Sequence, residues 1–215
     1  MKKICSICLV VLVLGMISGC ATKYPEVDTV YIQKNGTVQE ATVESFDKSY
    51  YKEEELEDFI NAHIEEYEGT YEKGSVVLKD FLVEEGTAKM MMKYDGYQNY
   101  IDFNGRELFA GTVVQAIAAG YNFSGDFLAV EDGQTVGNAV SDTEGAAGSA
   151  AVTGAVDGST VTSDEDCKVV IINEDTDVVV KGTIRYVSAG SVTVKDKSTA
   201  SVKTVNGGVS YIIYK

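Results

Sequence analysis

The sequence predicts an α+β fold: antiparallel hairpins with one long and one short helix, followed by a β-rich C-terminal region. Residues 28–130 combine segments in which apolar and polar residues alternate, typical of strands, with two segments of helical periodicity. Residues 167–215 then contain a series of short Val-, Ile- and Tyr-rich segments separated by Gly, Asn, Asp and Ser. Such regular spacing of short segments is typical of all-β structure.

Two hairpins are expected in the first part of the chain. Strand-like alternation lies on both sides of Asn35-Gly36, and this dipeptide suits a two-residue hairpin turn. A second pair of alternating segments flanks Glu85-Gly86. Between the two hairpins, "KEEELEDFINAHIEEYEG" has helical periodicity and ends at Gly69, a residue typical of helix C-termini.

The expected apolar face of this long helix contains several large side chains: Leu56, Phe59, Ile60, Ile64 and Tyr67. The only histidine, His63, lies next to this face, which predicts a partly buried, hydrogen-bonded side chain. The acidic residues at the start of the helix suit the positive end of its dipole, and the later ones, Glu65, Glu66 and Glu68, are expected to form a solvated face.

Two further segments complete this part of the chain. "DGYQNYIDFNG" (95–105) is interpreted as a loop or an irregular strand. "GTVVQAIAAGY" (111–121) predicts a short helix, because Thr112 and Gln115 have the spacing of a capping box and Gly120 follows the apolar run.

Residues 131–166 differ sharply in composition from the rest of the chain. They contain eight acidic residues, no basic residue, and no Leu, Ile or aromatic residue. This composition predicts a disordered acidic linker rich in Gly, Ala, Ser and Thr. As an alternative, some of its Val- and Thr-containing pieces form edge strands.

The region 167–215 is short for an independent hydrophobic core. Its strands are therefore expected to pack on the domain formed by residues 28–130, or on each other with its help. A short β-solenoid is the alternative, since the strands are rich in Val and the turns in Gly.

The N-terminus has the order of a secretory signal peptide. Lys2 and Lys3 precede an apolar run from Ile4 to Ile17, and the small residues Ser18 and Gly19 follow. The run is shorter than the roughly 20 residues that a membrane-spanning helix needs. Residues 1–19 are therefore predicted to be an export signal.

The sequence Ile17-Ser18-Gly19-Cys20 resembles the lipobox of bacterial lipoproteins. The resemblance is limited to this N-terminal signal. It implies cleavage between Gly19 and Cys20, a diacylglyceryl thioether on Cys20 and a further acyl chain, such as palmitate, on the new amino group. Residues 20–27 then form a lipidated tether, and the membrane is a partner through this lipid. The implied location is the extracytoplasmic face of the cell membrane, or the outer membrane in an organism with two membranes.

The net charge of −15 argues against nucleic acid and anionic lipid headgroups as direct partners, because both would be repelled by a negative surface. Cys5 and Cys8 leave with the signal peptide, and lipidation consumes the Cys20 thiol. Cys167 is thus left without a disulfide partner. Its acidic flank is the opposite of what a reactive thiol needs, which predicts a small packing residue.

No catalytic residue, metal site or cofactor site is recognisable in the sequence. One histidine and one free thiol are too few for the N and S ligands of a zinc site. The candidate binding surface is an aromatic cluster interspersed with Asp, Asn and Gln, a mixture that suits contacts with sugars or peptide side chains. Its members are Tyr94, Tyr97, Tyr100 and Phe103. Packing of these rings in the sheet is the favoured interpretation of the same pattern, since tyrosine is common in strands and the lack of Trp weakens a carbohydrate-binding role.

These observations predict a lipid-anchored cell-envelope protein, more consistent with a non-catalytic binding or structural module than with an enzyme. Its expected partner is an envelope protein or a cell-wall component. The alternative is a carboxylate-dependent envelope hydrolase or wall-modifying enzyme. A substrate-binding lipoprotein of a transporter is disfavoured, because such proteins usually need two α/β lobes and a longer chain.

Overall fold

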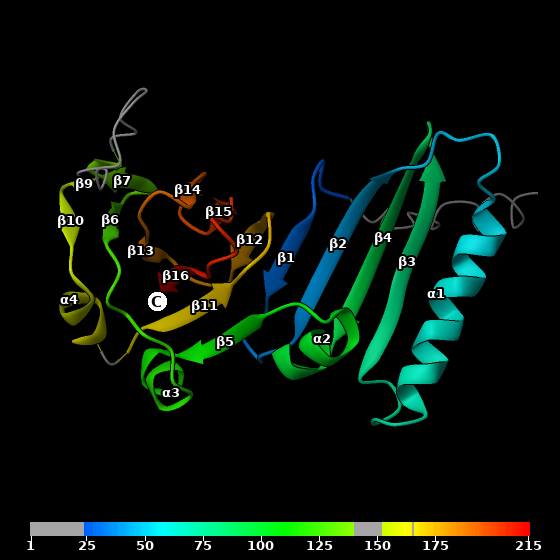
Figure 1. The fold of residues 1–215 in the computed structure, drawn as a ribbon, viewed down its shortest axis with the longest axis horizontal. Coiled ribbons are helices and arrows are strands. Elements are labelled where there is room, and N and C mark those ends of the chain that lie inside the picture. The colour runs from blue at the N-terminus through cyan, green and yellow to red at the C-terminus, as the bar shows by residue number, and fades with distance from the viewer. Residues whose placement is uncertain (1–23, 140–151, 165) are drawn as a thin grey trace, which may run out of the picture.

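Two β-sheets packed face to face form the frame of the molecule, which is elongated, with a long helix at one end (Figure 1). The computed structural model describes residues 24–139, 152–164 and 166–215. The expected signal peptide and Cys20 lie outside the described residues. The secondary structure of the described residues combines helices with a larger number of strands, in agreement with the broad α+β prediction.

Each sheet contains seven strands, and both combine early and late parts of the chain. The first sheet has the order β14 (Val192–Val194), β15 (Thr199–Val202), β12 (Thr176–Val180), β1 (Thr29–Ile32), β2 (Val38–Ser45), β4 (Thr87–Tyr94) and β3 (Val76–Glu84). The second has the order β10 (Ala155–Val156), β6 (Phe127–Glu131), β13 (Ile184–Ser188), β16 (Ser210–Tyr214), β11 (Lys168–Ile172) and β5 (Leu108–Thr112), with β7 (Gln134–Val136) paired to β6. A two-stranded ladder joins β8 (Asn138–Ala139) to β9 (Val152–Thr153).

Both hairpins are confirmed, although residues 33–37 separate the strands of the first one in place of the predicted two-residue turn. β1 pairs with β2 in antiparallel register across the Asn35-Gly36 turn, where Gly36 has a φ of 87°. β3 pairs with β4 across Glu85 and Gly86, both with positive φ. Positive φ is expected at the turns of tight hairpins and favours glycine.

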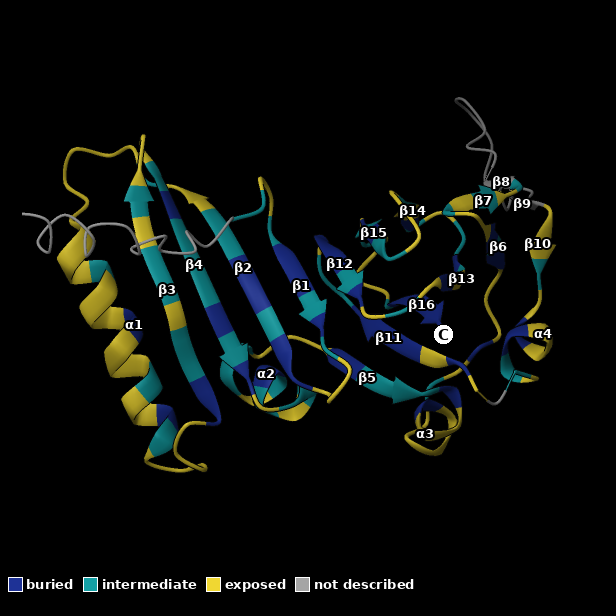
Figure 2. Cartoon of the chain, turned by 180° about the vertical axis from the view of Figure 1, so that it is seen from behind, coloured by how far each residue is buried: buried dark blue, intermediate teal, exposed yellow. Residues whose placement is uncertain are grey.

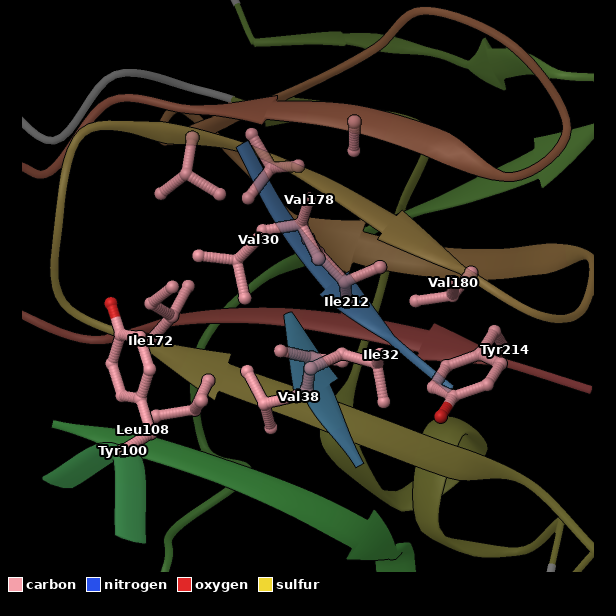
Figure 3. Packing of buried hydrophobic residues seen from close by; sticks show 14 of the residues in the cluster. Val30, Ile32, Val38, Tyr100, Leu108, Ile172, Val178, Val180, Ile212 and Tyr214 are labelled. Atoms are coloured by element: carbon pink, nitrogen blue, oxygen red, sulfur yellow. The ribbon is translucent and has the colours of Figure 1, made fainter. Parts of the chain in front are cut away.

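The core lies between the two sheets (Figure 3). In β1, Val30 and Ile32 face the core and alternate with Thr29 and Tyr31, as the two-residue period of a strand requires. The second sheet contributes side chains such as Ile172 and Ile212 from the other side.

The other face of the second sheet carries a separate apolar cluster. Alternate residues of the same strands, among them Val169, Ile171 and Ile213, pack there with residues of α3 (Val113–Ala118) and α4 (Gly158–Thr162). The strands β11 and β16 are therefore buried on both sides, which explains why they read as continuous apolar runs.

The long helix is confirmed as α1 (Glu53–Glu68), but the prediction of its apolar face is wrong at one residue, Phe59. Ile60 and Tyr67 are buried, and Leu56 and Ile64 pack against the core. Phe59 is instead 68% exposed. Because successive helical residues differ by about 100°, Phe59 points well away from its buried neighbour Ile60.

The prediction of a loop or irregular strand at 95–105 is wrong. Tyr97–Asn104 forms the helix α2, with Gly96 before it and Gly105 in left-handed conformation at its end. The short helix α3 is confirmed together with its capping box: the Thr112 hydroxyl accepts from the Gln115 N–H, and the Gln115 side chain accepts from the Thr112 N–H.

The prediction of a disordered linker at 131–166 is wrong for the part of this segment that the structure describes. It contains β7, β10 and α4, and β10 pairs with β6 at the edge of the second sheet. The alternative of edge strands is thus correct at these points. Residues 140–151 and 165 lie outside the described part of the chain.

The C-terminal segments form strands as predicted, and their pairing ties them to the earlier part of the chain. β12 pairs in parallel with β1, while β11 pairs with β5 and β13 with β6. Pairing among the C-terminal strands themselves is antiparallel. This is not the parallel stacking of a β-solenoid.

Candidate functional site

Four aromatic rings and one imidazole form a continuous row along α1 and α2. In order, the aromatic row consists of Phe59, His63, Phe103, Tyr67 and Tyr71. The ring centroids are 6.4 Å apart for Phe59–His63, 4.5 Å for His63–Phe103, 5.5 Å for Phe103–Tyr67 and 4.3 Å for Tyr67–Tyr71. The first three distances lie within the range of about 4.5–7 Å for favourable aromatic pairs, and Tyr67 and Tyr71 are stacked slightly closer, with their planes 13° apart.

The spacing of the sequence builds this row. Phe59, His63 and Tyr67 follow one another at intervals of four residues on α1, and Tyr71 continues the interval just after the helix ends. Residues four apart lie on the same side of a helix, one turn above another. Phe103 comes from α2, which lies beside the first sheet next to α1 (Figure 1).

The row runs from the surface into the core and back to the surface. Phe59 and Tyr71 are 68% and 45% exposed, Tyr67 is buried and Phe103 is half-buried. His63 is exposed, so the prediction of a partly buried histidine is wrong. Figure 2 shows that most of α1 is exposed, with buried patches only on the side facing β3.

The surroundings of the row are strongly acidic. Helix α1 contains many Glu and Asp residues and no Lys or Arg. The Tyr67 hydroxyl donates a 2.9 Å hydrogen bond to Asn99 Oδ1. Burial, reinforced by the nearby Asp102 carboxylate, raises the pKa of Tyr67. Exposed aromatic faces beside carboxylates are well suited to bind ammonium or guanidinium groups.

A buried polar network lies behind the helices and involves two carboxylates. The Tyr94 hydroxyl donates a 2.6 Å hydrogen bond to Glu40 Oε2, and Asn104 Nδ2 donates to the same oxygen at 3.3 Å. Arg106 Nη1 lies 2.7 Å from Glu174 Oε2 and 3.6 Å from Glu40 Oε1. The Tyr100 hydroxyl donates to Glu174 and lies 3.5 Å from Glu40 Oε1.

The alternation of β2 explains why Glu40 is buried. It lies two residues after the core residue Val38 and therefore points to the same side of the sheet. Burial raises the pKa of Glu40, opposed by the Tyr94 hydrogen bond and, to a lesser degree, by Arg106. Burial and the Glu40 carboxylate together raise the pKa of Tyr94.

This network has the form of a structural junction. It joins β2, β4, α2 and the β11–β12 turn, and four protein groups bind the two carboxylates. Neither Glu40 nor Glu174 lines the four cavities of ≈ 250 Å³ to ≈ 420 Å³ at the surface of the described part of the chain whose linings are known.

The predicted binding surface of Tyr94, Tyr97, Tyr100 and Phe103 requires correction. Tyr94 and Tyr100 are fully buried, with ring centroids 5.1 Å apart, so the four rings do not form one exposed surface. Tyr97 contacts Phe109 beside the second apolar cluster, whereas Phe103 belongs to the aromatic row. The signal for the row was the four-residue spacing of Phe59, His63, Tyr67 and Tyr71.

Cys167 is fully buried just before β11. Burial, reinforced by Asp164, raises the pKa of its thiol to about 11. Among the described residues, no group of three or more His, Cys, Asp or Glu side chains is arranged to hold a metal ion.

Comparison with known proteins gives no relative: the chain matches no protein-family model, no curated protein and no solved structure.

Proposed function

We propose that this chain is a lipid-anchored cell-envelope protein at the extracytoplasmic face of a membrane, and that it acts as a non-catalytic binding module. The lipobox-like Ile17-Ser18-Gly19-Cys20 after an export signal supports the anchoring. In the described part of the chain, no helix has the length and apolar character needed to cross a bilayer. Two or three acyl chains on Cys20 are enough for stable attachment.

The observation that carries the binding role is the exposure of the two ends of the aromatic row, Phe59 with His63 at one end and Tyr71 at the other, beside the acidic face of α1. Its partner is an envelope protein or a cell-wall component that presents amino or guanidinium groups. Attraction between opposite charges speeds the encounter, and the exposed rings provide the apolar contact.

Anchoring is tested by fractionation of cells that express the full chain. The wild-type protein remains with the membranes after washing in high salt and is released by detergent. Cys20→Ala removes the lipidated sulfur, and the protein is then recovered in the soluble extracytoplasmic fraction. A Cys20→Ala protein that resists release as strongly as the wild type contradicts lipidation.

The binding surface is tested with a photo-crosslinking amino acid in intact cells. Placed at Phe59, in the row, it captures one envelope component. At Val114 on α3, which is 54% exposed, it captures none. Equal capture at both positions, or capture that Tyr71→Ala leaves unchanged, contradicts the assignment to the row.

A carboxylate-dependent hydrolase is the second candidate, favoured by the paired Glu40 and Glu174 and by the raised pKa of Glu40. Tyr, Asn and Arg side chains already bind both carboxylates, which disfavours a role for them in hydrolysis. Turnover of purified cell wall by the detergent-solubilised protein, lost in Glu40→Gln while the protein stays folded, would favour this second function.

A further inference from the structure

A small cavity lies at the edge of the core, between the loop that joins β1 to β2 and the end of the second sheet. Its volume is ≈ 250 Å³, which suits a compact chemical group better than a drug-sized molecule. The lining comes from both sheets and from α3: Ile32 with residues 33–36, residues 110–112, Gln115, Lys168 and Tyr214. None of the residues of the aromatic row lines this cavity.

Strand register places three polar side chains of the lining on the same side of the second sheet. Thr112 of β5 is paired with Lys168 of β11, and Lys168 is paired with Tyr214 of β16. Directly opposite residues of antiparallel strands project to one face, and Lys168 lies two residues before the core residue Val170. Thr112, Lys168 and Tyr214 therefore face the first sheet, where the core opens to the cavity.

The charged side chains that line this cavity are Lys34 and Lys168. Both are exposed, and neither forms a salt bridge with a carboxylate in the described part of the chain. Asp164, close by in the sequence, is bound by Lys215 at 2.8 Å. Carboxylates line two of the other three cavities, and no charged residue lines the third. This cavity is thus a local site of positive charge in a molecule whose net charge is −15.

Tyr214 gives an independent reason to expect a ligand. Its side chain is only 5% exposed, and its hydroxyl forms no hydrogen bond with a described residue. Burial raises the pKa of this hydroxyl to about 12, so it stays protonated and can donate. Figure 3 shows the ring at the margin of the core, near Ile32 and Val180. Buried tyrosine hydroxyls usually have a partner, and the cavity that Tyr214 lines is the place where one can bind.

Two further donors come from the capping box of α3. The Thr112 hydroxyl accepts from the Gln115 N–H at 3.1 Å, and Gln115 Oε1 accepts from the Thr112 N–H at 2.9 Å. These bonds use the acceptor oxygens and leave the Thr112 O–H and the Gln115 Nε2 amide able to donate to a ligand. The lining thus combines hydrogen-bond donors with positive charge, which matches a ligand that carries negatively charged oxygen atoms.

We propose that this cavity binds a compact oxyanion, a carboxylate or phosphate group carried by a small molecule. Lys34 and Lys168 provide the ionic contacts, and the Tyr214 hydroxyl donates a hydrogen bond to an oxygen of the ligand. The site does not depend on the lipidation of Cys20 or on the aromatic row. It gives the protein a second binding function, with the opposite charge preference to that of the row.

The test titrates the full protein, solubilised in a neutral detergent, with N-acetylglycine at low ionic strength. Saturation transfer to the methyl resonance of this ligand measures its binding. The wild-type protein is expected to bind it saturably and to show no binding of the uncharged N-acetylglycinamide. A parallel titration with inorganic phosphate, followed by the width of the phosphorus resonance, separates the two sources: the tighter of the two anions identifies the group that the site takes.

Substitutions assign the binding to the cavity. Lys168→Gln removes one ammonium group and Tyr214→Phe removes only the hydroxyl, and each is expected to raise the Kd at least about fivefold. Lys203→Gln makes the same change of charge at a different cavity and leaves the Kd unchanged. Because Tyr214→Phe keeps the buried ring, its thermal unfolding remains cooperative, which separates a loss of binding from a loss of the fold.

Absence of saturable binding of both anions overturns the proposal. Equal weakening in Lys168→Gln and Lys203→Gln, the result expected of general charge attraction, overturns it as well, and so does binding of N-acetylglycinamide as tight as that of N-acetylglycine. The Cys20→Ala protein is expected to bind the anion like the wild type, so the outcome is independent of the anchoring.

Discussion

At the scale of single residues, Glu40 is the side chain that most needs explanation. It is 7% exposed in the middle of a β-strand, and Tyr94, Asn104 and Arg106 surround its carboxylate. A buried charge is tolerated only when such partners replace the lost water. The network therefore fixes how β2, α2 and the β11–β12 turn fit together. Burial of the Glu40 charge lowers the stability of the fold near neutral pH.

The first prediction follows from the raised pKa of Glu40. A carboxyl group that has a higher pKa in the folded state than in the unfolded state binds more protons when folded. Its contribution to stability is therefore fully present below the ordinary carboxyl pKa and is lost as the pH rises through the raised value. In urea titrations, the unfolding free energy of the wild type falls relative to that of Glu40→Gln over this window. Parallel pH profiles for the two proteins would contradict the burial of Glu40 as a charged group.

Cys167 gives a second prediction at this scale. Because its thiol is buried and its pKa is about 11, Cys167 of the folded protein reacts with a thiol reagent at pH 8 at least about 100-fold more slowly than after unfolding. The rate of reaction in buffer and in denaturant is the measurement. Comparable rates would mean that the residue is accessible.

At the scale of elements, the success of the sequence predictions depends on how local the signal is. The hairpin around Asn35-Gly36, the capping box of Thr112 and Gln115 and the existence of helix α1 depend on neighbouring residues, and each was recognised. The length of the hairpin loop was not. Helix α2 was missed because three tyrosines and a phenylalanine near it suggested a strand. The strand β10 and the helix α4 were missed because polar composition was interpreted as disorder.

The docking of α4 gives a third prediction. A Cβ atom on buried Gly158 would lie 1.5 Å from the carbonyl oxygen of Phe123, so a side chain there forces the helix away from the second sheet. Gly158→Ala is expected to lower the unfolding free energy by about 1–3 kcal/mol, the range for overpacked interiors. Gly125→Ala is the matched control, since a Cβ at that position has open space. Equal thermal stability of the two variants would contradict the placement of α4.

At the scale of the whole molecule, the pairings that join its two halves have no local signal. The parallel pairing of β1 with β12 links residues 29–32 to 177–180. Together with the pairing of β5 with β11, which sets Leu108 opposite Ile172, it brings Glu174 close to Glu40. The aromatic row was partly visible as four-residue spacing, but the helical phase was misjudged at Phe59 and His63. Expectations for the signal peptide and Cys20 concern residues outside the described part of the chain.

The interleaved sheets yield a fourth prediction. A chain that ends after Val209 lacks β16, whose neighbours in the second sheet are β13 and β11 and whose residues lie in both apolar clusters. Removing it exposes both sides of the core, so the truncated protein loses cooperative unfolding by circular dichroism. A truncated protein that still unfolds in one sharp transition would show that residues 24–209 form a sufficient core.

The central claim is that acyl chains on Cys20 hold this acidic, β-rich body just outside a membrane, where the row on α1 meets its partner. Mass spectrometry of the intact protein extracted from its native membrane tests this claim most directly. The account predicts a polypeptide that begins at Cys20 and carries the added mass of a diacylglyceryl group and a further acyl chain. A protein that retains residues 1–19, or one whose Cys20 sulfur is unmodified, would contradict it.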